Sequence, residues 1–166
     1  MCRWENSGIR TTVITVRGAA SKLLLLLTLW EDLAGSSFLL PEDSEERKAG
    51  RQREIRIITI DDLLNEHTCF VPDLVKLDVQ GYELEVLKGA QALFGQTEVF
   101  IIETSLYEFL PNMPSIYDII VYMKDRGYVI YDLIELSRRP FDNALAQIDV
   151  VFVKSNGPFR NHRSWS

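Results

Sequence analysis

Three ionisable side chains lie where two apolar segments of the sequence end, and their spacing suits proton transfer and ligand binding. Lys76 and Asp78 interrupt the apolar run 74–79 and are two residues apart, so they point to the same face of a strand. Glu103 ends a second apolar run, residues 98–103. Open α/β sheets bind ligands at the carboxyl ends of their strands, so we expect Asp78 in a site that Glu103 can also face. A carboxylate there can take the proton of a hydroxyl group.

Each of these residues also has a structural interpretation, which the sequence leaves open. Asp78 can cap the helix that follows it, and Glu103 can serve the sheet alone. A lysine on a strand covered on both faces is costly unless it is paired, and Asp78 is the nearest partner for Lys76 on that face. Asp149, inside an otherwise apolar strand, is predicted to pair with Lys76 or with a backbone turn. Asp78 and Glu103 are too few ligands for a metal, so no metal site is predicted.

A strand, a tight turn and a helix position the site around Asp78. Residues 74–79 have the length and composition of a strand that is buried on both faces. Gly81 permits a tight exit from that strand. From Glu83 onward the apolar residues take helical spacing, at positions 86, 87, 90, 93 and 94, and Gly95 is suited to end the helix.

Other strands and helices follow from apolar runs and capping patterns. Strands are predicted at residues 9–16, 22–28, 36–40, 55–60, 128–134 and 148–153. Thr59 with Asp62 and Ser115 with Asp118 form capping boxes, each of which predicts the start of a helix. The last two strands are joined by a polar loop without a helical pattern, so we expect them to be antiparallel.

Length and charge indicate a single acidic domain. The chain has 166 residues, enough for one domain at 1–154, followed by a tail at 155–166 that we expect to be mobile. The mixed-charge run 41–54 is predicted to be a solvated loop. The net charge of −6 argues against nucleic acid as a partner, because a phosphate-binding surface should be basic.

The cysteines and the longest apolar run bear on location. Two cysteines without disulfide or metal spacing favour a reducing, cytoplasmic setting. The apolar run 23–30 is shorter than the roughly 20 residues that a membrane-spanning helix needs. We therefore expect no membrane association, and we expect this run to be a buried strand in preference to a signal peptide.

The stretch around Asp78 resembles a protein family. Residues 76–90, KLDVQGYELEVLKGA, are similar to the signature K-[IL]-D-V-[EQ]-G-x-E-x-x-V-L-x-G-A of the FkbM-type S-adenosylmethionine-dependent methyltransferases. Residues 59–64, TIDDLL, are similar to the T-[IL]-D-[DE]-L-L element that commonly precedes this signature in the family. The resemblance covers almost the whole chain and corresponds to the later two thirds of the family's catalytic domain.

The resemblance implies a fold, an activity and a set of site residues. The fold is α/β, a Rossmann-like methyltransferase sheet that is mostly parallel with an antiparallel last strand and is N-terminally incomplete. The activity is transfer of a methyl group from S-adenosylmethionine to a small-molecule acceptor, a hydroxyl of a sugar, polyketide or other secondary metabolite. The implied site residues are Asp78, Glu103 and Lys76 for catalysis, Ala20 and Asp78 for the cofactor, and Gln80, Tyr82 and Tyr107 for the substrate.

Two departures from the family pattern support an alternative. The glycine-rich G-x-G loop that binds the cofactor after the family's first strand is absent from this sequence. Gln80 stands where the family often has Glu, and an amide cannot act as a base. The alternative is a catalytically silent fragment, or an α/β module derived from such an enzyme that binds a partner. The sequence does not indicate an oligomeric state.

Overall fold

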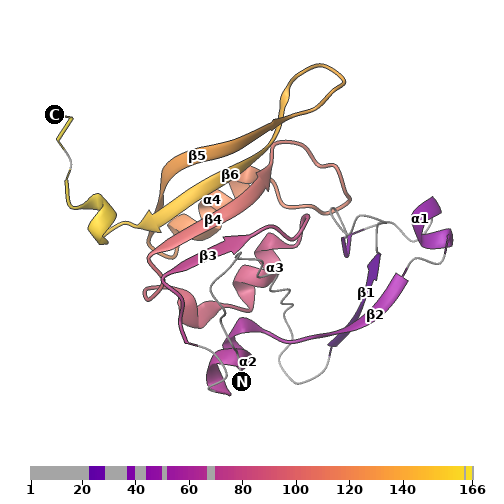
Figure 1. Cartoon of the computed structure of the whole chain (residues 1–166), viewed down its shortest axis with the longest axis horizontal. Helices are drawn as coiled ribbons and strands as arrows, with labels where there is room; N and C mark the ends of the chain where they lie inside the picture. The colour runs from indigo at the N-terminus through magenta and orange to yellow at the C-terminus, as the bar shows by residue number, and fades with distance from the viewer. Residues whose placement is uncertain are drawn as a thin grey trace, which may run out of the picture.

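The computed structural model describes residues 23–28, 37–39, 44–49, 52–66, 70–162 and 164–165. These residues form a mixed four-stranded sheet with helices, together with a separate pair of strands (Figure 1). The strands of the larger sheet lie in the order β3 (Leu74–Leu77), β4 (Val99–Ser105), β6 (Leu145–Lys154) and β5 (Tyr128–Arg138). The α/β class predicted from the sequence is confirmed at this level.

The pairing of the strands confirms the expected antiparallel ending. β3 and β4 are parallel, whereas β6 lies antiparallel between β4 and β5. β5 and β6 are both longer than predicted, because their hydrogen-bonded pairing continues through register shifts up to Arg138 and Leu145. The connection between them is therefore a hairpin that projects from the sheet (Figure 1).

Helices α3 (Glu83–Lys88) and α4 (Ile116–Lys124) pack against one face of the sheet, and α4 lies behind the sheet in Figure 1. The core between them combines side chains from both layers: Leu77, Phe100, Ile102, Val150 and Phe152 from the strands, and Val86, Leu87, Ile119 and Met123 from the helices. A helix with apolar residues at this spacing buries one stripe, which is why one face of the sheet is covered by these two elements.

The expectation that β3 is buried on both faces is wrong. Leu77 is buried in the core, but Leu74 is 51% exposed and the side chain of Lys76 is 48% exposed. Alternate residues of a strand point to opposite faces, and α3 and α4 pack against only one of those faces. Lys76 therefore keeps access to water, which removes the large desolvation cost that a fully buried lysine carries.

Both predicted capping boxes are present. Thr59 begins α2 (Ile60–Asn65) and Ser115 begins α4, and in each case the side chain of the third helical residue accepts from the capping backbone N–H. The prediction of one helix from residue 83 to 94 is wrong. α3 ends at Lys88 with Gly89 as its C-cap, and a short 3₁₀ helix, η1 (Gln91–Leu93), follows it.

The end of α3 is fixed by contacts with α2. A β-carbon at Gly89 would lie 3.3 Å from the side chain of Thr59, so the two elements approach closely at this point. Asp61 accepts hydrogen bonds from the backbone N–H groups of Gln91 and Ala92, at 2.9 and 2.8 Å. These bonds favour a new turn over continuation of α3.

The smaller pair of strands consists of β1 (Leu23–Thr28) and β2 (Gln52–Ile57), which are antiparallel. The predicted loop at 41–54 is ordered in part, because it contains α1 (Glu45–Lys48) and the start of β2. The predicted tail contains one 3₁₀ turn, η2 (Pro158–Arg160). The predicted strand at 9–16 lies outside the described residues. Within the described ranges, none of the helices has the length and apolarity that crossing a membrane requires.

Candidate functional site

The site is built at the edge of the sheet where β3 and β4 end. Leu77 at the end of β3 pairs with Ile102 of β4, so the next residues along the two parallel strands, Asp78 and Glu103, come side by side. Asp78 is exposed and Glu103 is half-buried. The register of the strands thus places the two carboxylates next to each other, as the sequence-based expectation of a shared site requires.

Gln80 connects the two carboxylates. Its amide nitrogen Nε2 donates to Asp78 Oδ1 at 2.9 Å and to Glu103 Oε2 at 2.9 Å. Its backbone has a φ of 50°, in the left-handed region that non-glycine residues seldom adopt. Its carbonyl oxygen accepts from Ser37 Oγ at 2.9 Å. The strained turn is thereby held in the conformation that aims the amide at both carboxylates.

The turn after Gln80 is held by a buried carboxylate that the sequence analysis did not single out. Glu83 is 2% exposed, and its Oε1 accepts from the backbone N–H groups of Gly81 at 3.1 Å and Val79 at 3.3 Å. An acidic residue in the first turn of a helix, two positions after a glycine in a tight turn, is the sequence signal for this arrangement. Glu83 fixes the path of the chain between β3 and α3.

A separate segment, residues 37–39, packs against this turn. The ring of Phe38 lies 5.0 Å from the ring of Tyr82, measured between centroids. Gly81 has a φ of 94°, and a β-carbon there would lie 2.6 Å from Leu39 Cδ1. The segment therefore requires a glycine in the turn, for backbone conformation and for space.

The carboxylates around Gln80 change one another's proton affinity. The pKa of Glu103 is raised to about 7, mainly by burial and then by the negative charges of Asp78, Glu83 and Asp149, while Lys76 opposes the rise. Burial also raises the pKa of Glu83, although its backbone hydrogen bonds counteract the effect. Glu103 is thus a carboxylate that exchanges its proton near neutral pH, the property that a general base requires.

Lys76 pairs with Asp149 of β6. Lys76 Nζ lies 2.8 Å from Asp149 Oδ2, and Asp149 is only 4% exposed. The hydrogen bond to Asp149 is the main reason that the pKa of Lys76 is raised. The ion pair that the sequence suggested between Lys76 and Asp78 is thus made with Asp149 instead, whereas the suggested pairing of Asp149 with Lys76 is confirmed. Asp149 lies opposite Glu103 in the β4–β6 pairing, so the ion pair adjoins the site.

Comparison with known protein families finds one that matches most of the chain. The Methyltransferase FkbM domain family matches residues 10–130 of the chain. The chain belongs to the FkbM methyltransferase family. The match contains the strand of Lys76, the turn of Gln80 and the strand of Glu103, so the whole carboxylate group lies inside the FkbM domain. No curated protein and no solved structure matches the chain significantly.

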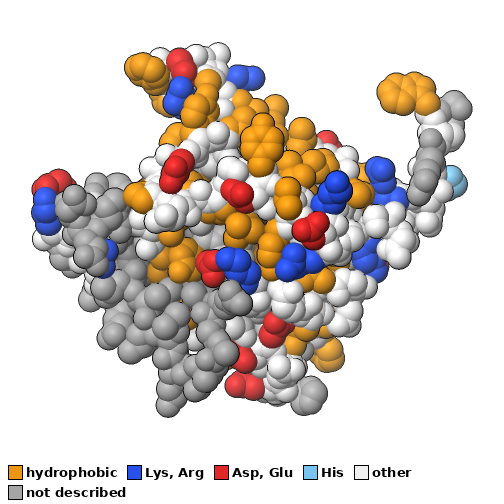
Figure 2. Space-filling model, turned by 180° about the vertical axis from the view of Figure 1, so that it is seen from behind, with side chains coloured by type: hydrophobic (Ala, Val, Ile, Leu, Met, Phe, Trp, Pro, Cys, Tyr) orange, Lys and Arg blue, Asp and Glu red, His pale blue; other side chains and the backbone are white. Residues whose placement is uncertain are grey.

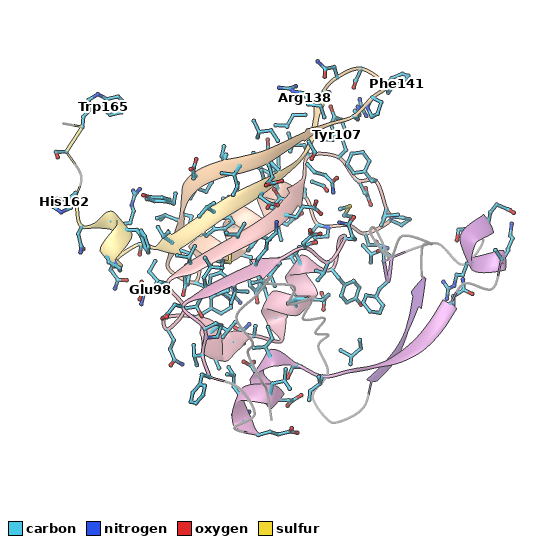
Figure 3. All side chains as sticks on the ribbon, viewed as in Figure 1. Glu98, Tyr107, Arg138, Phe141, His162 and Trp165 are labelled. Atoms are coloured by element: carbon cyan, nitrogen blue, oxygen red, sulfur yellow. The ribbon has the colours of Figure 1, made fainter. Side chains whose placement is uncertain are left out.

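The structure brings some of the predicted site residues of this FkbM domain together and separates others. Asp78, Gln80 and Glu103 are joined by hydrogen bonds, and Tyr82 lies two residues after Gln80, at the start of α3. Tyr107 lies beyond the end of β4 beside the β5–β6 hairpin (Figure 3). Ala20 is outside the described residues. Among the described residues, no group of three or more His, Cys, Asp or Glu side chains could hold a metal ion.

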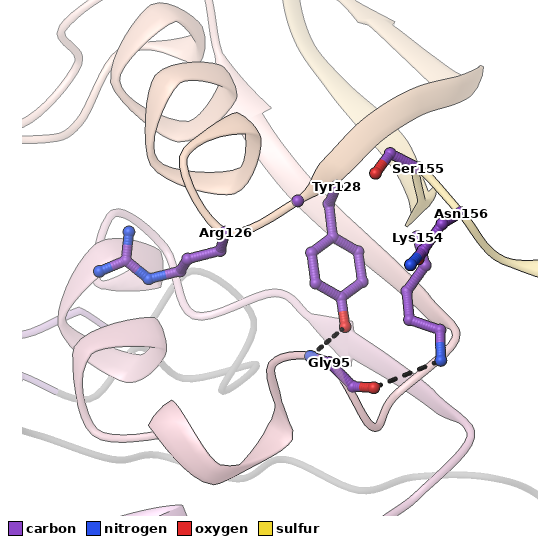
Figure 4. Close-up of a pocket in the computed structure, with 7 residues that line it drawn as sticks. Gly95, Arg126, Tyr128, Lys154, Ser155 and Asn156 are labelled. Carbon is purple, nitrogen blue, oxygen red and sulfur yellow. Dashed lines mark hydrogen bonds between the residues drawn. The ribbon is translucent and has the colours of Figure 1, made fainter.

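A hollow of about 350 Å³ lies at the opposite end of the sheet, where β5 begins and β6 ends (Figure 4). The polar side chains of Tyr128 and Lys154 in its lining already have partners. Tyr128 Oη donates to the Thr97 carbonyl at 2.6 Å and accepts from Gly95 N–H at 3.2 Å, and Lys154 Nζ pairs with Glu98 Oε1 at 2.5 Å. The Arg126 side chain points away from the others (Figure 4). We interpret this hollow as structural.

Proposed function

We propose that this FkbM-family chain binds S-adenosylmethionine and methylates a hydroxyl group of a sugar or another secondary metabolite. The observation that carries the proposal is Glu103, a half-buried carboxylate with a pKa of about 7 that Gln80 holds next to Asp78. In this proposal the sheet is Rossmann-like. The order β3-β4-β6-β5, with β6 antiparallel in an inner position, supports that fold.

The residues at the strand ends fit the charge of the cofactor. S-adenosylmethionine carries a positively charged sulfur and an ammonium group, and when bound it supplies an electrophilic methyl group. Asp78 offers an exposed carboxylate at the carboxyl end of β3, with Glu103 beside it. A negatively charged edge of this kind attracts a cationic ligand. In the proposal, Asp78 binds the cofactor's positive groups.

Glu103 would act as the general base. A hydroxyl is a poor nucleophile, so its proton has to leave as the new bond to oxygen forms. A carboxylate with a pKa of about 7 is ionised in a large fraction of molecules at neutral pH and still has an appreciable affinity for the proton. Gln80 cannot take the proton, and its role is to keep the two carboxylates in position.

The cellular setting that we propose follows from composition. The two cysteines lack disulfide spacing, which supports a cytoplasmic enzyme. The net charge of −6 supports a small-molecule acceptor over nucleic acid.

The decisive experiment is isothermal titration of the full chain with S-adenosylmethionine. We expect saturable binding that Asp78→Ala abolishes and Asp125→Ala retains, because Asp125 is an exposed carboxylate at the far end of α4. Absence of binding by a folded, monodisperse sample would contradict the proposal. Mass spectrometry of a panel of sugars incubated with cofactor and protein then tests for O-methyl products, which Glu103→Gln should remove.

A catalytically silent module is the second candidate. The absence of a G-x-G loop from the sequence favours it, since glycines normally let the backbone approach this kind of cofactor. Gln80, in place of the frequent glutamate, favours it as well. A folded chain that binds no cofactor but co-purifies stoichiometrically with one protein partner would support this function instead.

A further inference from the structure

We propose that the β5–β6 hairpin tip and the loop after β4 form a platform that binds the non-reacting end of an extended, uncharged carbohydrate acceptor. The platform consists of Tyr107, Phe109, Arg139 and Phe141. The inference rests on the proposed methyl transfer to a hydroxyl group and adds the size and class of the acceptor.

The aromatic rings of the platform are grouped around the guanidinium group of Arg139. The Arg139 guanidinium lies 4.1 Å from the ring centre of Tyr107 and 5.8 Å from that of Phe141. The rings of Tyr107 and Phe109 are 5.8 Å apart. Figure 3 shows Tyr107 and Phe141 gathered at this end of the molecule with Arg138. Two segments that are distant in sequence therefore build one surface.

Asp142 fixes the guanidinium in place. Arg139 Nε donates to Asp142 Oδ1 at 2.7 Å, and Arg139 Nη2 donates to Asp142 Oδ2 at 2.6 Å. A bidentate pair of this kind restricts both side chains. The guanidinium group, with the Tyr107 ring 4.1 Å from it, is thus pre-organised, which lowers the entropic cost of binding a ligand.

Several apolar side chains in and near the platform are exposed to solvent. Phe141 is 90% exposed and Phe109 is 47% exposed, and Leu106 and Leu136 beside them are also exposed. Figure 2 shows apolar side chains at the tip of the projecting hairpin. Contiguous exposed apolar surface of this kind marks an interaction site more often than a structural one.

The platform lies in line with the carboxylates but at a distance from them. Asp149 is opposite Glu103, and Leu145, at the base of the hairpin tip, pairs with Arg138. Asp149 lies four positions after Leu145 in β6, which corresponds to about 13 Å along the strand. An acceptor that contacts both places is therefore longer than a single sugar ring.

The charges around the platform are balanced, which favours an uncharged ligand over an anionic one. The two arginines, Arg138 and Arg139, are accompanied by two carboxylates, Glu108 and Asp142. A surface without excess positive charge is unsuited to nucleic acid or to an anionic membrane. Aromatic faces surrounded by polar groups suit a sugar, whose ring has an apolar C–H face and a rim of hydroxyl groups.

The test measures binding of neutral oligosaccharides, from one to six units and with several linkages, to the full chain by isothermal titration. We expect affinity to increase with length, and Phe141→Ala to weaken binding of the longer members by about 5- to 10-fold without changing that of the monosaccharide. Phe159→Ala is the control, because Phe159 is an exposed phenylalanine at the other end of β6, away from the platform. Phe141→Ala should also raise KM for long acceptors and leave kcat unchanged.

The same samples are titrated with S-adenosylmethionine, which separates this inference from the proposed function. Cofactor binding without any oligosaccharide binding overturns the platform alone. Equal affinity for short and long sugars, or equal effects of Phe141→Ala and Phe159→Ala, also overturns it. Binding of single-stranded RNA or of anionic vesicles in place of oligosaccharides does the same. Absence of cofactor binding concerns the proposed function, while length-dependent sugar binding would still support the platform.

Discussion

Gln80 donates from Nε2 to Glu103 Oε2 at 2.9 Å, and the same nitrogen donates to Asp78 Oδ1 at 2.9 Å. A neutral amide thus lies between two carboxylates that would otherwise repel each other. The amide satisfies an acceptor oxygen of each carboxylate without adding a positive charge. Burial, followed by the negative charges of nearby carboxylates, raises the pKa of Glu103 to about 7. A base that works near neutral pH follows from this arrangement.

The pH dependence of methyl transfer should report the ionisation of Glu103. Because the ionised form takes the proton, kcat/KM should increase with pH through about 7. Asp149→Asn removes a negative charge that raises the pKa of Glu103, so the midpoint should move to lower pH. Lys76→Met removes the charge that lowers this pKa, so the midpoint should move to higher pH. Rate profiles at saturating cofactor check both shifts. Movement of both midpoints in the same direction would argue against Glu103 as the base.

The same ionisation should make the fold less stable at alkaline pH. The pKa of Glu103 is higher in the folded chain than its ordinary value of 4.5, so the folded state binds more protons than the unfolded state between these values. The free energy of unfolding should therefore fall as pH rises from about 4.5 to about 7. Glu103→Gln, which mimics the protonated form, should remove this part of the fall. Urea denaturation at pH 5 and pH 8 provides the measurement, and identical pH dependence in both proteins would refute the idea.

The two partners of the Lys76–Asp149 pair should not be equally costly to remove. Lys76→Met leaves the 4%-exposed carboxylate of Asp149 without its cation and should cost about 1–3 kcal/mol. Asp149→Leu leaves a half-exposed lysine that water can solvate, so its cost should be smaller. The double variant should recover most of the loss caused by Lys76→Met alone. Urea denaturation of the four proteins completes the cycle, and strictly additive costs would show that the pair has no coupling energy.

The local part of the site follows from the sequence. Lys76 and Asp78 are two residues apart in a strand, and parallel strands end at one edge, which brings Asp78 to Glu103. The resemblance to the FkbM family added Gln80 to the predicted site residues. Capping boxes at Thr59 and Ser115 were equally predictable, because the donor and acceptor are only three residues apart.

The contacts between residues that are far apart in the sequence could not be predicted from the sequence alone. Asp78 and Asp149 were both candidate partners for Lys76, and Asp149 is 73 residues away in the sequence. The position of β6 beside β4 brings Asp149 to the lysine, and the sequence does not show that position. The end of α3 at Gly89 depends on close contact with Thr59, and the spacing of apolar residues does not predict that contact. The fold of residues 41–54 was missed for a similar reason, since a mixed-charge run can pair as a strand when a partner such as β1 is available.

Packing of residues 37–39 on the Gly81 turn can be tested with two glycines. Gly81 and Gly95 both have a positive φ, 94° and 82°, so replacement by alanine should cost each of them about 1–2 kcal/mol for backbone conformation. A β-carbon at Gly95 would meet nothing within 4 Å, whereas one at Gly81 would lie 2.6 Å from Leu39 Cδ1. Gly81→Ala should therefore be the more destabilising change in urea denaturation.

Leu39→Ala supplies the control for this comparison. It removes the atom that an alanine at position 81 would strike, so adding it to Gly81→Ala should cost less than adding it to the wild-type chain. In the Gly95→Ala background, Leu39→Ala should show its full cost. Displacement of residues 37–39 should also break the bond from Ser37 Oγ to the Gln80 carbonyl, and thereby weaken cofactor binding in Gly81→Ala but not in Gly95→Ala. Equal losses of stability and of affinity in the two glycine variants would mean that residues 37–39 do not support the turn.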